Sequence, residues 1–305
     1  MIVEYFERFD NKNIMNRAKA IPTKNNPFYI SLVILFFMNS CHCIAQDREK
    51  VYLKNHRIAT KMKAMVQHRD TIENIQKITN VDRPNFLVYS PEDSKNNGVG
   101  IIICPGGGYY LLAADLEGYE IAEWLNSLGY TAFVLHYSVP NKRRMALEDV
   151  MTTVSYIRNN NTKFKVHKNK IGVLGFSAGG HLAAKVASIK KDERFAENEN
   201  QELFRPDFSI LIYAAYLAEK NSTLFADDVT VGIHTGPTFL FATADDSHTN
   251  GSLAMAEKLR QNGVPFEVHV LAQGGHGYGL RKGNKAAETW PLLAENWLRS
   301  LFQDD

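Results

Sequence analysis

A G-x-S-x-G sequence spans residues 175–179 and centres on Ser177. This pattern places a serine hydroxyl on a sharp turn between a strand and a helix. The apolar run Ile171 to Leu174 precedes it directly, and a helix-forming run follows it directly. Glycines two residues to either side of the serine relieve crowding in such a turn. In this context the pattern predicts that Ser177 is a nucleophile and not part of a plain tight turn.

A serine hydroxyl is a weak nucleophile at neutral pH and needs a histidine base that is held by a carboxylate. His276 lies in the glycine-rich segment 274–279, after the last predicted strand and before the last predicted helix. A flexible backbone there can present an imidazole to the serine, so we predict that His276 is the base. His181 lies on the same predicted helix as the serine and His269 within a predicted strand, so we interpret both as packing or surface residues.

Two adjacent aspartates are candidates for the carboxylate. Asp245 and Asp246 follow the apolar run Thr238 to Ala242, and either gives the chain order Ser, Asp, His. One of two neighbours can face the histidine, and in this type of loop the later residue usually does. We therefore favour Asp246, with Asp245 as the alternative acid or as a solvated or loop-capping residue.

Acyl transfer also needs hydrogen-bond donors for the oxyanion that develops at the carbonyl. The sequence PGGGY at 105–109 follows an apolar run, and its glycines let backbone amides approach a small oxyanion. We predict that this glycine loop supplies an oxyanion donor beside the backbone N–H of Ala178. No G-K-[ST] follows these glycines, no G-x-G-x-x-G leads into a helix, and no H-E-x-x-H or C-x-x-C occurs. The sequence therefore predicts no phosphate site, no metal site and no cofactor.

The elements that must position these residues alternate along the chain. Continuous apolar runs, rather than strictly alternating ones, are typical of strands buried on both faces of a parallel sheet. The predicted strands are Phe86 to Tyr89, Val99 to Cys104, Thr131 to Tyr137, Ile171 to Phe176, Phe208 to Tyr213, Thr238 to Ala242 and Phe266 to Leu271. The predicted helices are Glu117 to Leu128, Ala146 to Asn159, His181 to Ile189, Ser252 to Gln261 and Ala286 to Leu301. This alternation predicts one doubly wound α/β domain over residues 46–305, with Lys190 to Gln201 as a surface insertion.

The overall composition excludes several classes of protein. The chain has 305 residues, of which 45% are hydrophobic, and 35 Lys and Arg against 33 Asp and Glu leave a net charge of +2. Such a balance argues against a nucleic-acid-binding surface. The three cysteines, Cys41, Cys43 and Cys104, are too few and too unevenly spaced for a disulfide framework, and Cys104 is expected to be buried at a strand end.

The N-terminal segment has the pattern of a secretory signal peptide. Residues 28–38 are almost entirely apolar, follow basic residues and precede a small-residue cleavage site ending at Ala45. The run is too short to span a bilayer as a helix. We expect cleavage near Ala45 and a secreted or periplasmic protein, with Met1 or Met15 as the start. A lipid anchor at Cys41 and a buried N-terminal helix are the alternatives.

Taken together, these motifs resemble those of α/β-hydrolase esterases, and more narrowly the bacterial secreted carbohydrate esterases known as acetyl xylan esterases or xylanase-like proteins. The resemblance covers roughly residues 85 to 300. It rests on Cys-Pro-Gly-Gly-Gly-Tyr at 104–109, Glu117-Gly118, the segment Gly175 to Ala183, Arg205-Pro206-Asp207-Phe208 and Gly274-Gly275-His276-Gly277. It implies the Ser177, Asp246, His276 triad with an oxyanion hole from Gly107, Gly108 and Ala178. It also implies the release of acetyl or another small acyl group from plant polysaccharide.

The remaining alternatives concern the substrate. Stacking of Tyr109, Tyr110 and Tyr278 on sugar rings is a hypothesis, and aromatic packing around the loops is its alternative. A general carboxylesterase or lipase-like enzyme, a peptidase and a non-catalytic binding module with this fold are the rival functions. The acyl group, the polysaccharide and the oligomeric state stay open at this level.

Overall fold

The computed structural model describes residues 48–53, 64–189, 204–219 and 222–302. The residues from Arg48 onward form one compact unit. The signal peptide with its alternatives at Cys41, and the insertion at Lys190 to Gln201, lie outside the described residues.

Eight strands of the described chain form one large sheet in the order β1-β4-β7-β5-β8-β9-β10-β11. At the first edge of the sheet, β1 pairs antiparallel with β4, and β4 pairs antiparallel with β7. All later neighbours in this order pair parallel. The bounds are β1 Lys50–Tyr52, β4 Asn85–Tyr89, β5 Gly100–Cys104, β7 Thr131–His136, β8 Ile171–Phe176, β9 Phe208–Ile212, β10 Thr238–Thr243 and β11 Phe266–Leu271. The seven predicted strands are therefore confirmed to within one or two residues at their ends.

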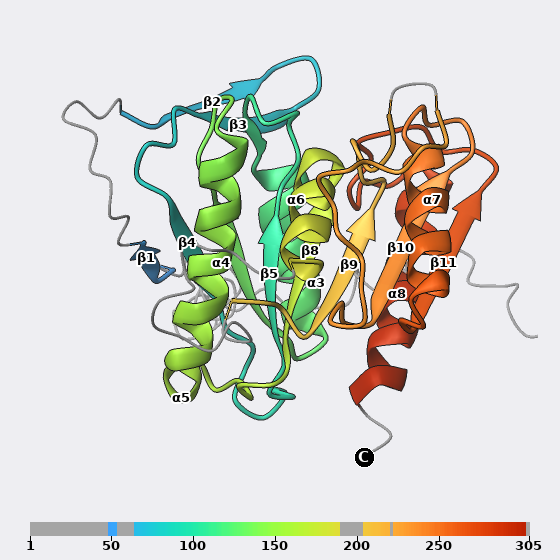
Figure 1. Ribbon diagram of the computed structural model, residues 1–305. Coiled ribbons are helices and arrows are strands. Elements are labelled where there is room, and N and C mark those ends of the chain that lie inside the picture. The colour runs from blue at the N-terminus through green and yellow to red at the C-terminus, as the bar shows by residue number, and fades with distance from the viewer. Residues whose placement is uncertain (1–47, 54–63, 190–203, 220–221, 303–305) are drawn as a thin grey trace, which may run out of the picture. The chain divides into compact units, whose positions relative to one another are not determined.

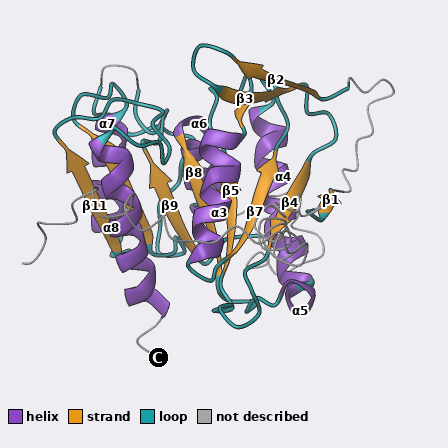
Figure 2. Cartoon of the chain, turned by 180° about the vertical axis from the view of Figure 1, so that it is seen from behind, coloured by secondary structure: helices purple, strands orange, loops and turns teal. Residues whose placement is uncertain are grey.

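Helices cover both faces of this sheet, as Figures 1 and 2 show from opposite sides. The helices α4 (Arg143–Asn159), α6 (Ser177–Ala187) and α7 (Thr249–Gln261) pack into one apolar cluster, and α3 (Glu120–Ser127) and α8 (Lys285–Phe302) pack into the other. The short helix α5 (Asn161–Phe164) follows α4, and a wide π-helical turn, Asp115–Tyr119, leads into α3. Every residue of β5, β7, β8, β9 and β10 is buried, which explains why these strands are apolar without alternation. The structure thus has the predicted doubly wound architecture.

A second, three-stranded antiparallel sheet has the order β2-β3-β6, with bounds Val66–Asp70, Ile75–Thr79 and Leu112–Ala113. In Figure 1, the β2–β3 hairpin lies beyond one end of the large sheet. The parallel strands of the large sheet point toward this end. The sequence did not predict the strands of the second sheet, because β2 (VQHRD) is polar and largely exposed, and β6 has two residues. Active sites of open α/β sheets lie at this carboxyl end.

Two further details bear on the site. Helix α6 begins at Ser177 itself, four residues before the predicted start, although the intervening glycines have low helix propensity. Cys104 ends β5 and is fully buried, as predicted, and burial raises the pKa of its thiol. In the described part of the chain, no helix combines the length and apolar character needed to cross a membrane.

Candidate active site

Ser177 occupies a strained turn between β8 and α6. Its φ of +50° lies in the left-handed region, which residues other than glycine rarely adopt, whereas Phe176 before it is extended. The flanking residues Gly175 and Gly179 must be glycines because the backbone of this turn lies very close to neighbouring backbone atoms. A β-carbon on Gly179 would lie 2.0 Å from the carbonyl oxygen of Cys104, and one on Gly175 would lie 2.2 Å from that of Gly179. The turn therefore fits against the end of β5 because both positions lack a side chain.

The structure brings the three predicted triad residues together from separate loops. The Ser177 Oγ lies 2.8 Å from Nε2 of His276, and Nδ1 of the same ring lies 2.7 Å from Oδ2 of Asp246. An imidazole with its proton on Nδ1 donates to Asp246 and accepts from the serine hydroxyl. The Asp246 side chain is 2% exposed and that of His276 is 34% exposed, so the acid is shielded while the base faces the cleft.

The ionisation of Asp246 fits this arrangement. Burial by itself raises the pKa of the Asp246 carboxyl, but the hydrogen bonds from His276 and from the His248 amide outweigh it and hold the pKa below its usual value. A buried carboxylate that stays ionised can keep the imidazole in one tautomer and stabilise the imidazolium.

The glycine loop after β5 lies beside the serine. Gly107 and Gly108 have φ values of +126° and +65°, and both line the same cleft as Ser177 and His276. Among the described residues, the N–H groups of Gly107 and Gly108 donate to no protein acceptor. Ala178 lies in the first turn of α6, where N–H groups have no partner within the helix. These three amides are therefore available to an oxyanion.

The cleft over Ser177 has a volume of about 460 Å³. The β2–β3 hairpin forms one wall through Glu73, Ile75 and Lys77, and the loop with Tyr110 forms another. A neighbouring cavity, also of about 460 Å³, shares Glu73, Ile75, Leu116, His276 and Gly277 with it and continues toward Lys282 and Asn284. His276 thus borders both hollows.

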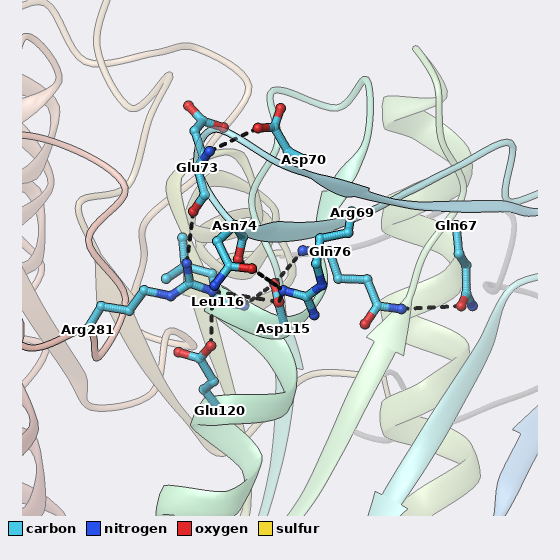
Figure 3. A network of polar contacts seen from close by, with 10 residues as sticks. All are labelled: Gln67, Arg69, Asp70, Glu73, Asn74, Gln76, Asp115, Leu116, Glu120 and Arg281. Atoms are coloured by element: carbon cyan, nitrogen blue, oxygen red, sulfur yellow. Dashed lines mark hydrogen bonds and ion pairs between the residues drawn. The ribbon is translucent and has the colours of Figure 1, made fainter.

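Polar contacts fix the hairpin wall to the rest of the site, as Figure 3 shows. Arg281 donates to the carbonyl oxygen of Glu73 at 3.0 Å and to the Glu120 carboxylate at 3.1 Å. Asp115 accepts from the Gln76 amide at 2.8 Å and pairs with Arg69 at 3.0 Å. Sequence reasoning missed this wall, because its partners are far apart in the sequence and form no motif.

The three tyrosines occupy different environments. Tyr109 is 1% exposed and its hydroxyl lies 2.8 Å from Nδ1 of His181, so the expectation that its ring faces a sugar is wrong, and it packs instead. Tyr278 is 6% exposed and packs edge-on against Tyr213, although it borders the second hollow. Tyr110 is 61% exposed and lines the cleft over Ser177. Of the three, Tyr110 alone offers an open ring.

Two histidines with no predicted catalytic role border the site. His181 is buried and bonded to Tyr109 and Asp228, which confirms its interpretation as a packing residue. The His248 ring centroid lies 5.1 Å from that of His276, and His248, Asp246 and His276 could present ligand atoms to one metal ion. Asp246 and His276 are already hydrogen-bonded to each other, which is the arrangement expected of an imidazole base and the carboxylate that orients it.

Comparison with known proteins identifies the same fold and family. Residues 87–213 match the BD-FAE family. The chain is 25% identical over 271 residues to an acetylxylan esterase of Xylanibacter ruminicola, which covers 80% of this chain and 53% of that protein. It is 30% identical over 221 residues to endo-1,4-beta-xylanase B of Butyrivibrio fibrisolvens, which covers 64% of this chain and 34% of that protein. The chain therefore spans about half, or less, of the length of these two relatives.

The solved structures match over most of their own length and over about three quarters of this chain. The acetyl ester-xyloside bifunctional hydrolase from Caldicellulosiruptor lactoaceticus is 34% identical with a TM-score of 0.62, covering 72% of this chain and 88% of that one. The α/β hydrolase MGS-M1, from a Medee basin deep-sea metagenome library, is 28% identical with a TM-score of 0.60, covering 78% and 98%. The carboxylesterase Cest-2923 from Lactobacillus plantarum, at 22% identity, shares the fold. The chain belongs to the esterases of the α/β-hydrolase fold.

Proposed function

We propose that the protein is a serine esterase that removes short acyl groups, acetyl foremost, from carbohydrate. The observation that carries this proposal is the hydrogen-bonded series of Ser177, His276 and Asp246 at the open end of the cleft. A serine within hydrogen-bond reach of an oriented imidazole is the arrangement that activates the hydroxyl for acyl transfer.

In the first half of the reaction, the ester carbonyl lies between Ser177 and the amides of Ala178 and of Gly107 or Gly108. The serine oxygen bonds to the carbonyl carbon while its proton moves to Nε2 of His276, and the amides stabilise the oxyanion. When the tetrahedral intermediate collapses, the bond to the alcohol oxygen breaks and His276 gives that oxygen its proton. The alcohol leaves and the acyl group stays on Ser177.

The second half returns the enzyme to its starting state. His276 takes a proton from water, the hydroxide oxygen bonds to the acyl carbon, and the ester bond to Ser177 breaks. Proton transfer from His276 restores the serine hydroxyl, and a carboxylic acid leaves. Asp246 holds the ring through both halves and stays ionised.

A carbohydrate alcohol is the leaving group that the surroundings and the relatives support. Three of the five proteins named above are an acetylxylan esterase, a xylanase and an acetyl ester-xyloside hydrolase. The cleft combines charged side chains, Glu73 and Lys77, with the exposed ring of Tyr110. Polar side chains next to an open aromatic face suit a sugar, which presents both hydroxyl groups and C–H faces.

Export of the protein is part of the proposal. It is supported by the basic, apolar and small-residue order of residues 1–45. Edman sequencing of the protein purified from the medium or the periplasm is expected to begin at Gln46. A mature protein that begins at Cys41 would instead favour the lipid-anchored form, and an exported protein that keeps residues 1–45 would contradict cleavage of a signal peptide.

The test of the esterase activity uses protein that begins at Gln46. We expect hydrolysis of p-nitrophenyl esters with a preference for acetate over octanoate, together with release of acetate from acetylated xylan. A preference for long acyl chains without release from xylan would favour a general carboxylesterase or lipase-like enzyme. Cleavage of peptide bonds without ester turnover would favour a peptidase, and no turnover of any of these substrates would favour a non-catalytic binding module.

A further inference from the structure

A buried carboxylate that the mechanism above does not use lies beneath the cleft. Glu117 belongs to the π-helical turn before α3, is 3% exposed and borders the cleft together with Ser177 and His276. Among the ion pairs of the described residues, none includes Glu117. A buried carboxylate without a cationic partner costs stability unless hydrogen bonds satisfy its oxygens.

Each oxygen of Glu117 accepts a hydrogen bond from a different active-site segment. Oε2 accepts from the N–H of Gly106 at 2.8 Å, and Oε1 accepts from the hydroxyl of Tyr213 at 2.8 Å. The Tyr213 oxygen in turn accepts from the N–H of Gly279 at 3.1 Å. Since that oxygen accepts the hydrogen bond from Gly279, the O–H of Tyr213 is directed to Glu117.

These contacts join the two catalytic loops through one side chain. Gly106 immediately precedes the oxyanion residue Gly107, and Gly279 follows His276 by three residues. Packing at this point is tight, because a β-carbon on Gly106 would lie 2.6 Å from Oε2 of Glu117 and 2.8 Å from the β-carbon of Ser177. A displacement of the carboxylate would therefore disturb the oxyanion loop at Gly106, where that loop packs closely beside Ser177.

Tyr213 is held in a matching position at the end of β9. Its φ of +38° is unusual for a residue with a side chain, and its ring packs 5.0 Å from the His276 ring between centroids. Burial raises the pKa of the Glu117 carboxyl, while the bonds from Tyr213 and Gly106 and the charge of His276 oppose that rise. Burial outweighs these effects, so the pKa stays above its usual value, and both oxygens accept hydrogen bonds because Gly106 and Tyr213 each present a donor.

We propose that Glu117 is a positioning residue that sets the oxyanion loop and the histidine loop relative to each other, through Gly106 on one side and through Tyr213 and Gly279 on the other. This inference rests on the proposed esterase function. In this role Glu117 does not contact the reacting atoms. Its removal should impair the transition state, where both loops act together, more than the binding of a small ester.

The test compares Glu117→Gln, Tyr213→Phe and the double variant on p-nitrophenyl acetate. Glutamine keeps the size of the side chain but presents an N–H₂ group to one of the two donors, and phenylalanine removes the hydroxyl that links Glu117 to Gly279. We expect each single variant to lower kcat by roughly 10- to 100-fold, with KM within about threefold of the parent value, because small misplacements of catalytic groups have effects of this size. The double variant should lose much less than the product of the two single effects, since both act on one connection.

Glu123→Gln is the matched control, because Glu123 lies on the adjacent helix α3, is exposed and pairs with Arg48 away from the cleft. It is expected to keep the parent kcat. Thermal unfolding is measured for every variant, and Tyr213→Phe keeps the test valid if Glu117→Gln does not fold.

Three results would overturn the inference while leaving the esterase function intact: full activity of Glu117→Gln, a rise in KM with unchanged kcat, or independent effects that multiply in the double variant. If the parent protein itself hydrolyses no ester, the proposed function fails instead.

Discussion

Asp245 and Asp246 are adjacent in the chain, yet their carboxylates bind to different parts of the histidine loop. Asp246 accepts from the ring of His276 at 2.7 Å, whereas Asp245 accepts from the backbone amides of Gly274 at 3.1 Å and Gly275 at 2.9 Å. Asp246 is buried and Asp245 is exposed. One aspartate therefore orients the imidazole and the other caps the loop that carries it.

This division predicts unequal effects of the same substitution. Asp246→Asn should lower kcat by about 10³- to 10⁴-fold, because an amide in its place supports the wrong tautomer of the imidazole. Asp245→Asn keeps one acceptor oxygen for the glycine amides and should cost less than about tenfold. Steady-state kinetics on p-nitrophenyl acetate measures both. Equal losses, or the larger loss at Asp245, would show that the acid is assigned to the wrong residue.

The exposed ring of Tyr110 predicts a substrate-dependent effect. Tyr110→Ala should raise KM for acetylated xylo-oligosaccharides by about 2- to 12-fold, which corresponds to the ~0.5–1.5 kcal/mol of an aromatic contact. Activity on p-nitrophenyl acetate should stay within about twofold, since that ester has no sugar to bind. Tyr52→Ala, at an exposed tyrosine on the edge strand β1, is the control. A loss of equal size on both substrates would argue against a sugar contact at Tyr110.

The close approach of α6 to β5 predicts a loss of stability at Gly179. A β-carbon there would lie 2.0 Å from the Cys104 carbonyl oxygen, so Gly179→Ala requires the helix to shift. We expect a decrease in the free energy of unfolding of about 1–3 kcal/mol, the usual cost of overpacking, with a loss of activity as Ser177 moves. Urea unfolding followed by circular dichroism measures the change. A variant as stable and as active as the parent would contradict the packing described for this turn.

A buried histidine predicts part of the acid sensitivity of the fold. His136 is 1% exposed, and burial lowers its pKa to about 4. The unfolded chain takes up this proton below about pH 6.5, whereas the folded chain does so near pH 4, so the contribution of His136 to stability is present above pH 6.5 and is lost as the pH falls toward 4.

Unfolding in urea at pH 7 and pH 5 tests this contribution. The parent protein should lose about 2 kcal/mol more than His136→Gln over that interval, because the limiting slope is about 1.4 kcal/mol per pH unit. His68→Gln, at an exposed histidine on β2, should lose as much as the parent. An identical pH dependence of the parent and His136→Gln would rule out this role for His136.

The parts of the site that follow from local sequence were predictable, and those that depend on distant contacts were not. Ser177 and His276 are recognisable because a strand, a tight turn and a glycine loop leave strong local patterns. The preference for Asp246 over Asp245 followed a general tendency of such loops, and in the structure the two carboxylates accept hydrogen bonds from separate donors, the His276 ring and the Gly274 amide. The role of Glu117 depends on Tyr213, which is 96 residues away, so no spacing rule reveals it.

The hairpin and the tyrosines show where pattern reasoning fails. Strand β2 is polar because its side chains are exposed, so it lacks the apolar run that marks the central strands. Tyr109 and Tyr110 are neighbours of identical type, but one points into the core and the other into the cleft. The backbone of the glycine loop decides between these directions, with a φ of +66° at Tyr109. The residue types alone do not reveal this backbone conformation.

The most direct test of the account is to trap the acyl group on Ser177. Protein that begins at Gln46 is mixed with p-nitrophenyl acetate, quenched in acid within the first turnovers and analysed by intact and peptide mass spectrometry. The account predicts one acetyl adduct, on the peptide that contains Ser177, in a burst equal to the enzyme concentration if deacylation limits the rate, and no adduct or turnover with Ser177→Ala. An acetyl group on another residue, or ester hydrolysis that survives in Ser177→Ala, would contradict it.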